Sequence, residues 1–419
     1  MIINRTRLYI LNLLLLLSTT IMAQEQKFAD SVAADSIAAD TLQIDSIPDL
    51  PWPQSLQARL DTLIKKSSVL KTSQLGLMVY DLTADSVLYT HDHKQVMRPA
   101  STMKLITAIT ALEKLGIDHE FKTQLYRKGD YIDSTRVFEG DIYIVGGMDP
   151  RLSKDDMKAF ADTLKALGID TIRGSIYADK SFKDADLYGE GWCWDDDNSM
   201  LSALVFNRKD DAMKHFLNAL KDAGIFHDGE TGEKTCPSGS EHIYTRTHAF
   251  LMILNKMMKD SNNLYAEAVY YQIGRTQGKP STAKKAKAVE EAMLRKIGIQ
   301  NLPHRFADGS GLSLYNYVTA EMEVAFLRYA YNNSHIYKYL RPTLPEAGID
   351  GTLEKRMQGT VAERNVAAKT GTLSGISSLA GYCTAANGHE LAFCIINQGV
   401  MKSAPAKTFQ DNICIALCK

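Results

Sequence analysis

The chain has 419 residues, which is enough to bury a large core in two or three domains. It is 45% hydrophobic and 23% charged, with a formal net charge of -1, as is typical of globular proteins. This balance excludes a general electrostatic attraction to nucleic acid or to an anionic membrane, and we expect no nucleic-acid partner.

The first 23 residues are predicted to be a secretory signal peptide. Arg5 and Arg7 give a positive start, residues 8–17 form an apolar run, and Ala23 ends the expected cleavage site. The alternative is an uncleaved membrane anchor, but the apolar run is short for crossing a bilayer. In either case the rest of the chain is exported, and we expect a periplasmic protein.

Residues 24–50 are expected to form a disordered linker, because they repeat small and acidic residues and contain almost no aromatic ones. The six cysteines all follow this segment, and their spacing leaves fifteen pairings open. Cys394 and Cys414 suit buried thiols as well as a bridge. No metal-ligand spacing is visible, so we expect no metal and no cofactor.

The folded part is expected to begin with a helix over residues 55–66, followed by a hairpin of strands over residues 74–80 and 86–89. These elements lead into the stretch over residues 98–112. Its apolar residues recur every three positions from Met103 onward, which predicts a buried helix ending near Gly116.

Ser101 is predicted to be the N-cap of this helix, with Lys104 in its first turn. Residues three apart share one helix face, so an amine lies beside a hydroxyl at the positive end of the helix. An activated serine nucleophile needs this arrangement. The spacing is common, however, and it recurs at Ser68 with Lys71 and at Ser281 with Lys284, the latter on an expected solvated surface helix that includes Glu290.

Shorter helical and strand patterns follow over residues 121–245, which we interpret as an inserted smaller subdomain. The catalytic domain is then formed by residues 51–120 and 246–419. A helix over residues 247–258 and a second helix from Leu264 enclose a polar loop with Ser261 and Asn263. Such a loop presents side chains to a cleft, but simple helix capping explains the same residues equally well.

The C-terminal part contains a glycine-rich turn, three strands and a helix. The turn over residues 308–313 lacks the Lys-Ser/Thr of a phosphate loop, so we interpret it as a tight turn close to the site. The strands are expected over residues 366–372, 377–384 and 389–397, with a covering helix over residues 404–417. The first strand carries Lys-Thr-Gly at Lys369, which alone could be an ordinary strand end.

Ser-x-x-Lys, Ser-x-Asn and Lys-Thr-Gly occur in this order at Ser101, Ser261 and Lys369. This trio is the signature of penicillin-binding proteins and class A β-lactamases. Segments over residues 147–150, 308–313 and 348–353 resemble further stretches of the low-molecular-mass class C penicillin-binding proteins, which are D-alanyl-D-alanine carboxypeptidases/endopeptidases.

The resemblance implies an α/β (α+β) fold, with a penicillin-binding transpeptidase/β-lactamase-like domain whose antiparallel sheet is flanked by helices. It also implies peptidoglycan peptides as substrates and β-lactam antibiotics as covalent inhibitors. Members usually have a larger insertion, so a β-rich subdomain is expected to be missing after residues 202–207. Met148 and Leu314 also depart from the family pattern, and the oligomeric state stays open.

The resemblance assigns a role to each motif residue. Ser101 is the nucleophile, Lys104 is the base that burial and the charge of Lys369 keep neutral, Ser261 relays a proton and Asn263 holds the substrate amide. The remaining roles are carboxylate binding by Lys369, Thr370 and Thr372, an oxyanion hole from the N–H groups of Ser101 and Thr372, and contact of Asp196 with the amino end of the diamino acid.

Three alternatives stay open at this point. A merely structural role for Asp196 is as compatible with the sequence as substrate contact. A serine β-lactamase shares the trio, but no class A Glu-bearing motif is apparent between Ser261 and Lys369. A non-catalytic wall-binding protein is the third alternative, and the intact nucleophile, base and carboxylate binder argue against it.

Overall fold

The computed structural model describes residues 50–193 and 198–419, and the chain from Pro51 onward forms one compact unit. The predicted signal peptide and the linker up to residue 49 lie outside the described residues, as does Asp196. Within the described part, no helix is long and apolar enough to cross a membrane.

A five-stranded antiparallel sheet has the strand order β10-β11-β12-β1-β2. Its pairing confirms the predicted hairpin at residues 74–89 and the three predicted C-terminal strands, and a turn over residues 385–388 joins the last two of these. The strands are β1 (Gln74–Asp81), β2 (Ser86–His91), β10 (Ala367–Leu373), β11 (Ile376–Thr384) and β12 (Glu390–Gln398).

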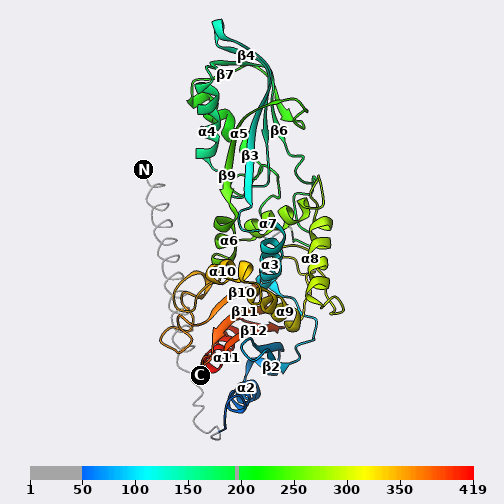
Figure 1. The fold of residues 1–419 in the computed structure, drawn as a ribbon, viewed down its shortest axis with the longest axis vertical. Coiled ribbons are helices and arrows are strands. Elements are labelled where there is room, and N and C mark those ends of the chain that lie inside the picture. The colour runs from blue at the N-terminus through cyan, green and yellow to red at the C-terminus, as the bar shows by residue number, and fades with distance from the viewer. Residues whose placement is uncertain (1–49, 194–197) are drawn as a thin grey trace, which may run out of the picture. The chain divides into compact units, whose positions relative to one another are not determined.

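Helix α3 (Met103–Leu115) is buried without interruption from Met103 to Leu112. Helices contact it from several sides, as Figure 1 shows for the cyan helix, so apolar or small residues are required all around it. The other helices of this part are α2 (Gln54–Lys66), α6 (Phe250–Lys259), α7 (Asn263–Arg275), α8 (Ala283–Ile297), α9 (Ala320–Tyr331), α10 (Ser334–Thr343) and α11 (Ser403–Cys418).

Helices α11 and α9 cover opposite faces of the five-stranded sheet (Figure 1). Gln410 of α11 donates hydrogen bonds to Ser377 of β11 and to Asn397 of β12. On β12, Cys394 contacts Glu323 of α9 instead. Side chains alternate along a strand, so residues 394 and 397 point to opposite faces. The prediction that the C-terminal helix covers the sheet is therefore confirmed.

A second sheet has seven strands, of which five follow the order β7-β5-β4-β3-β9; β6 pairs with β4, and β8 pairs with β6. With α4 (Lys154–Ala166) and α5 (Ala212–Asp222) it encloses an apolar cluster of its own. Its strands are β3 (Glu120–Ile132), β4 (Val137–Val145), β5 (Thr171–Arg173), β6 (Ile176–Asp179), β7 (Phe226–His227), β8 (Thr231–Glu233) and β9 (Glu241–Ala249). The proposed domain boundaries stay predictions.

Two expectations about local structure are wrong. Residues 247–249 are the end of strand β9 rather than the start of a helix, because they pair with β3. Strand β9 has mostly polar, half-exposed residues, so it lacks the apolar alternation that marks a strand. Helix α8 is not simply a solvated surface helix, because Glu290 is fully buried against α3.

Candidate active site

Ser101 lies in a 3₁₀ turn over residues 100–102, one turn ahead of α3. The prediction that it caps the helix is wrong: Thr102 is the residue in the N-cap position, and α3 begins at Met103. The hydroxyl oxygen of Ser101 instead lies 2.8 Å from Lys104 Nζ. The turn therefore presents the serine to the lysine rather than to the backbone of the helix.

The Ser101 turn is held closely on two sides by backbone. A Cβ placed on Gly371 of β10 would lie 2.7 Å from the carbonyl of Pro99 and 3.0 Å from the Ser101 nitrogen. A Cβ on Gly311 would lie 1.8 Å from the carbonyl of Ala100. Both positions require glycine, because real side chains do not approach backbone atoms this closely. The approach brings the Lys-Thr-Gly strand and the glycine-rich turn against the serine.

The amine of Lys104 has three hydrogen-bond partners and its residue is 0% exposed. Besides Ser101 Oγ, Nζ lies 2.8 Å from Asn263 Oδ1 and 2.7 Å from the carbonyl oxygen of Ser310. The last two groups can only accept hydrogen bonds, so they engage both N–H hydrogens of a neutral amine. The remaining lone pair of the nitrogen then faces the hydroxyl of Ser101.

Burial lowers the pKa of Lys104 to about 7, and the carboxyl groups of Asp308 and Glu267 oppose this effect only in part. Lys369 is equally buried, and burial together with the charge of Lys104 lowers the pKa of Lys369 well below its usual range. Exclusion from water is thus the main cause of the lowered pKa of both amines. A buried amine with a pKa near 7 is suited to act as a general base.

Ser261 and Asn263 lie at the junction between α6 and α7. Neither residue is the N-cap of α7. Asn262 takes this position, and its side-chain oxygen accepts a hydrogen bond from the N–H of Tyr265. Ser261 has a φ of 56°, an unusual left-handed conformation for a residue with a side chain. Its hydroxyl lies 2.8 Å from Lys369 Nζ. The local capping requirement is met by Asn262, which leaves its two neighbours available to the cleft.

The structure thus brings Ser101, Lys104 and Asn263 into one hydrogen-bonded set and Ser261 and Lys369 into a second, and the charge of Lys104 acts on Lys369. We call these five residues the Ser101 group. Thr370 and Thr372 follow on the same strand β10. The hydroxyl of Thr370 donates to Thr352, whereas the side chain of Thr372 is exposed.

The carbonyl of Ser310 is a functional group that the sequence did not identify, although the turn that contains it was expected near the site. A backbone carbonyl has no sequence signature. Only the path of the chain reveals it. Trp192 was likewise given no role by the sequence, yet its indole N–H donates to Asp308, the first residue of this turn, at 2.8 Å.

A cavity of about 310 Å³ adjoins the group and includes Asn263 in its wall. Its lining residues are mostly polar and come from three parts of the chain, namely Trp192, Asn198, Ser199, Arg208, Asn262, Asn263, Leu264 and Leu312. A space of this kind beside the serine can accommodate part of a peptide.

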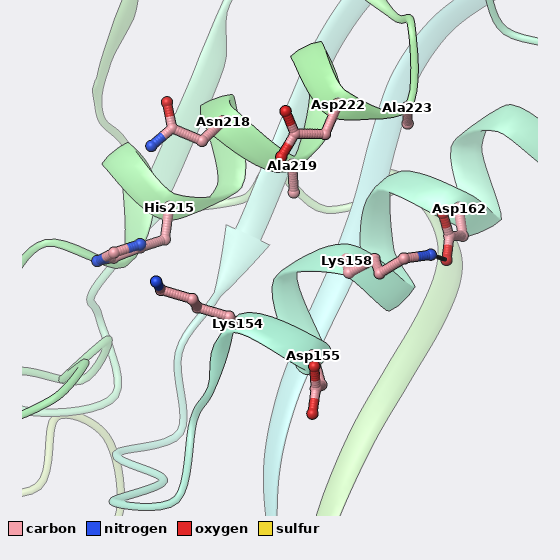
Figure 2. Close-up of a pocket in the computed structure, with 9 residues that line it drawn as sticks. All are labelled: Lys154, Asp155, Lys158, Asp162, His215, Asn218, Ala219, Asp222 and Ala223. Carbon is pink, nitrogen blue, oxygen red and sulfur yellow. Dashed lines mark hydrogen bonds and ion pairs between the residues drawn. The ribbon is translucent and has the colours of Figure 1, made fainter.

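A larger groove of about 400 Å³ lies between α4 and α5, shown in Figure 2. Its wall carries charged side chains of both signs, of which Lys158 and Asp162 pair with each other at 2.5 Å. None of the residues in the Ser101 group lines this groove. Size alone therefore does not locate the site.

A serine next to a buried lysine, set between an antiparallel sheet and a helical layer, defines a serine acyl-transfer enzyme of the penicillin-binding type. The sequence matches the family described as D-Ala-D-Ala carboxypeptidase 3 (S13) over residues 56–205 and 197–417, and the chain belongs to this family. The two matched segments meet where the sequence predicts a missing subdomain, which stays a prediction.

Similar proteins agree with this assignment. The chain is 30% identical to the D-alanyl-D-alanine carboxypeptidase of Actinomadura sp. (strain R39), over 87% of this chain and 84% of that protein. Penicillin-binding protein 4 (DacB) from Haemophilus influenzae has the same fold, with a TM-score of 0.78 at 23% identity over 84% of this chain and 98% of that structure. The predicted class C penicillin-binding protein, its fold and its serine-type D-Ala-D-Ala carboxypeptidase class are thereby confirmed.

One more solved structure has a similar fold. The penicillin G-acylated predatory endopeptidase Bd3459 from Bdellovibrio bacteriovorus has a TM-score of 0.52 at 16% identity, over 81% of this chain and 91% of that structure. At this identity the similarity concerns the fold alone.

Proposed function

We propose that Ser101 is the acylated nucleophile of this carboxypeptidase and that neutral Lys104 is its general base. The observation that carries this proposal is the bonding of Lys104, whose two N–H hydrogens are engaged by Asn263 and Ser310 while its lone pair faces Ser101 Oγ at 2.8 Å. A base must lie within hydrogen-bond reach of the proton that it abstracts, and this one does.

The acylation step follows from this geometry. As Ser101 Oγ forms a bond to the carbonyl carbon of the D-Ala-D-Ala peptide, its proton moves to Lys104 Nζ. When the C–N bond breaks, the proton passes to the leaving amine of the terminal D-Ala through the hydroxyl of Ser261. Water then attacks the acyl-enzyme, gives up one proton and restores the serine hydroxyl.

The substrate is held from the side of strand β10. Lys369, Thr370 and Thr372 bind its terminal carboxylate, and the N–H groups of Ser101 and Thr372 form the oxyanion hole, where one donor is typically worth about 3 kcal/mol. Because Asn263 Oδ1 is engaged by Lys104, its amide nitrogen is the part that holds the substrate carbonyl. Asp196 is proposed to contact the amino end of the diamino acid.

Peptidoglycan peptides are the proposed substrates, and β-lactams are the proposed covalent inhibitors. The family membership supports both, as does the penicillin G-acylated endopeptidase of similar fold. We further propose that the protein is exported after cleavage behind Ala23 and acts in the periplasm. N-terminal sequencing of the mature protein, with Gln24 expected as its first residue, tests this last point.

Replacement of Ser101 tests the assignment of the nucleophile. The variant Ser101→Ala should lose covalent labelling by a fluorescent penicillin and the release of D-Ala. Ser68→Ala is the matched control, because Ser68 begins the same Ser-x-x-Lys pattern outside the site. Intact-mass detection of a penicillin adduct on Ser101→Ala would overturn the assignment.

Two further measurements separate the alternatives. Slow recovery after penicillin labelling supports a peptidase, whereas many turnovers of a chromogenic β-lactam support a β-lactamase. Digestion of purified muropeptides distinguishes carboxypeptidase from endopeptidase cleavage, since the first releases D-Ala and the second splits cross-linked dimers.

A further inference from the structure

Glu267 lies on α7, one helical turn after Asn263, and is buried. Its carboxyl group accepts hydrogen bonds from two successive backbone N–H groups, that of Ser310 at 2.8 Å and that of Gly309 at 3.4 Å. The carbonyl of the same Ser310 accepts from Lys104 Nζ. One carboxyl group thus holds the peptide to which the amine of the general base is bonded.

A second buried carboxyl group, Glu290 of α8, lies on the other side of the same turn and is bonded differently. The hydroxyl of Thr107 lies 2.8 Å from the carbonyl of Gly309 and 3.0 Å from Glu290 Oε1. A hydroxyl has one hydrogen, which Thr107 can give either to the Gly309 carbonyl or to Glu290 Oε1, and a neutral Glu290 can donate to Thr107 when the carbonyl takes it. Its Oε2 has no hydrogen-bond partner among the described residues. Burial raises the pKa of Glu290 well above its usual range, so these contacts suit a neutral carboxylic acid.

We propose that Glu267 is a positioning residue for the general base: it fixes the Ser310 carbonyl against Lys104 and couples its own charge to the protonation of that lysine. The proposal rests on the assignment of Lys104 as base. Glu267 accepts bonds only from donors in the turn, which suits an ionised carboxylate, whereas the bonding of Glu290 suits the neutral form.

The titrations of the two groups are coupled. Burial raises the pKa of Glu267, the hydrogen bonds from Ser310 and Gly309 oppose this rise, and burial lowers the pKa of Lys104 to about 7. A protonated amine and an ionised carboxylate stabilise each other, so the proton on Lys104 is held more tightly when Glu267 is charged. The other titratable groups around this pair are Asp308, Glu290, Tyr270, Tyr271 and Lys369.

The variant Glu267→Gln removes the charge but keeps an oxygen that can accept from the Ser310 N–H. We expect the acid limb of the penicillin acylation rate to move by about one pH unit to lower pH, with a plateau within about threefold of wild type. Glu290→Gln is the matched control: it exchanges one neutral donor for another, and its pH profile should coincide with that of wild type.

The variant Glu267→Asp separates position from charge. It keeps the carboxylate but withdraws it by one methylene from the Ser310 N–H, so the plateau should fall about tenfold while the midpoint stays. This variant also tests the proposal if Glu267→Gln does not fold. A Glu267→Gln profile that superimposes on wild type, or a Glu267→Asp plateau that equals wild type, would overturn it.

Failure of this inference and failure of the base assignment give different results. If Lys104→Ala is still acylated at the wild-type rate, Lys104 is not the base and the proposed mechanism fails. If Lys104→Ala is inactive but the two Glu267 variants behave like wild type, the mechanism stands and only the role of Glu267 is lost.

Discussion

The pH dependence of acylation is the most direct consequence of the buried Lys104. A lysine in water has a pKa of 10.5, and burial lowers that of Lys104 to about 7. The difference corresponds to about 5 kcal/mol, at 1.36 kcal/mol for each pH unit. At pH 7 it raises the neutral fraction of the amine from roughly one in 3,000 to about one half.

The expected rate follows the neutral form of this amine. Below pH 7 the second-order rate constant for acylation should fall about tenfold per pH unit, to about 1% of its plateau at pH 5. Above pH 8 it should be constant until another group titrates. The sign follows from the role of the amine, since only the unprotonated form can accept the proton of Ser101.

The assay is stopped-flow acylation by a fluorescent penicillin between pH 5 and 9, with circular dichroism at each pH to show that the fold is kept. A rate that is flat over this range would refute the reasoning. A rate that still rises tenfold per pH unit up to pH 9 would refute it as well, because burial would then not have changed the pKa of the base.

Three further predictions follow from single contacts. Gly371→Ala places a Cβ 2.1 Å from Ser378 Oγ and 2.7 Å from the Pro99 carbonyl, so β10 must move from the Ser101 turn and acylation should fall about tenfold or more. Penicillin labelling measures this loss, with Gly232→Ala as the control, because a Cβ there would lie 3.7 Å from its nearest neighbour, Tyr177. Trp192→Phe removes the donor to Asp308 and should lower the free energy of unfolding by about 1–2 kcal/mol, measured by denaturant titration; an unchanged midpoint would contradict it. Because the pKa of Lys369 is lowered well below its usual range, binding of a carboxylate ligand near neutral pH should be accompanied by proton uptake. Calorimetry in buffers of different ionisation heat detects this uptake, and binding heats that do not depend on the buffer would contradict the prediction.

The sequence by itself was sufficient for the family, and it named the residues that we propose to carry the chemistry. Ser101, Lys104, Ser261 and Lys369 belong to motifs whose order along the chain is distinctive, and the apolar spacing after Met103 correctly predicted a buried helix. The two hairpins of the main sheet were equally readable, because runs rich in apolar and β-branched residues are separated by polar turns.

Other features depended on which segments meet in space. The turn around Ser101 was misjudged as a helix cap, because the competing bond from Ser101 to Lys104 is made only when Asn263 and Ser310 orient the amine. Glu290 was interpreted as a surface residue because it follows several lysines, although the packing of α8 on α3 buries it.

Local sequence thus determined which chemical groups are at the site, whereas the tertiary structure decided their ionisation state and their orientation. The pKa of Lys104 depends on the exclusion of water by α6, α7 and α9, which are more than one hundred residues away along the chain. Likewise, the acceptor that orients this amine is the main-chain carbonyl of Ser310, a group that every residue type possesses. Burial and backbone direction are properties of the folded chain, and no residue type encodes them alone.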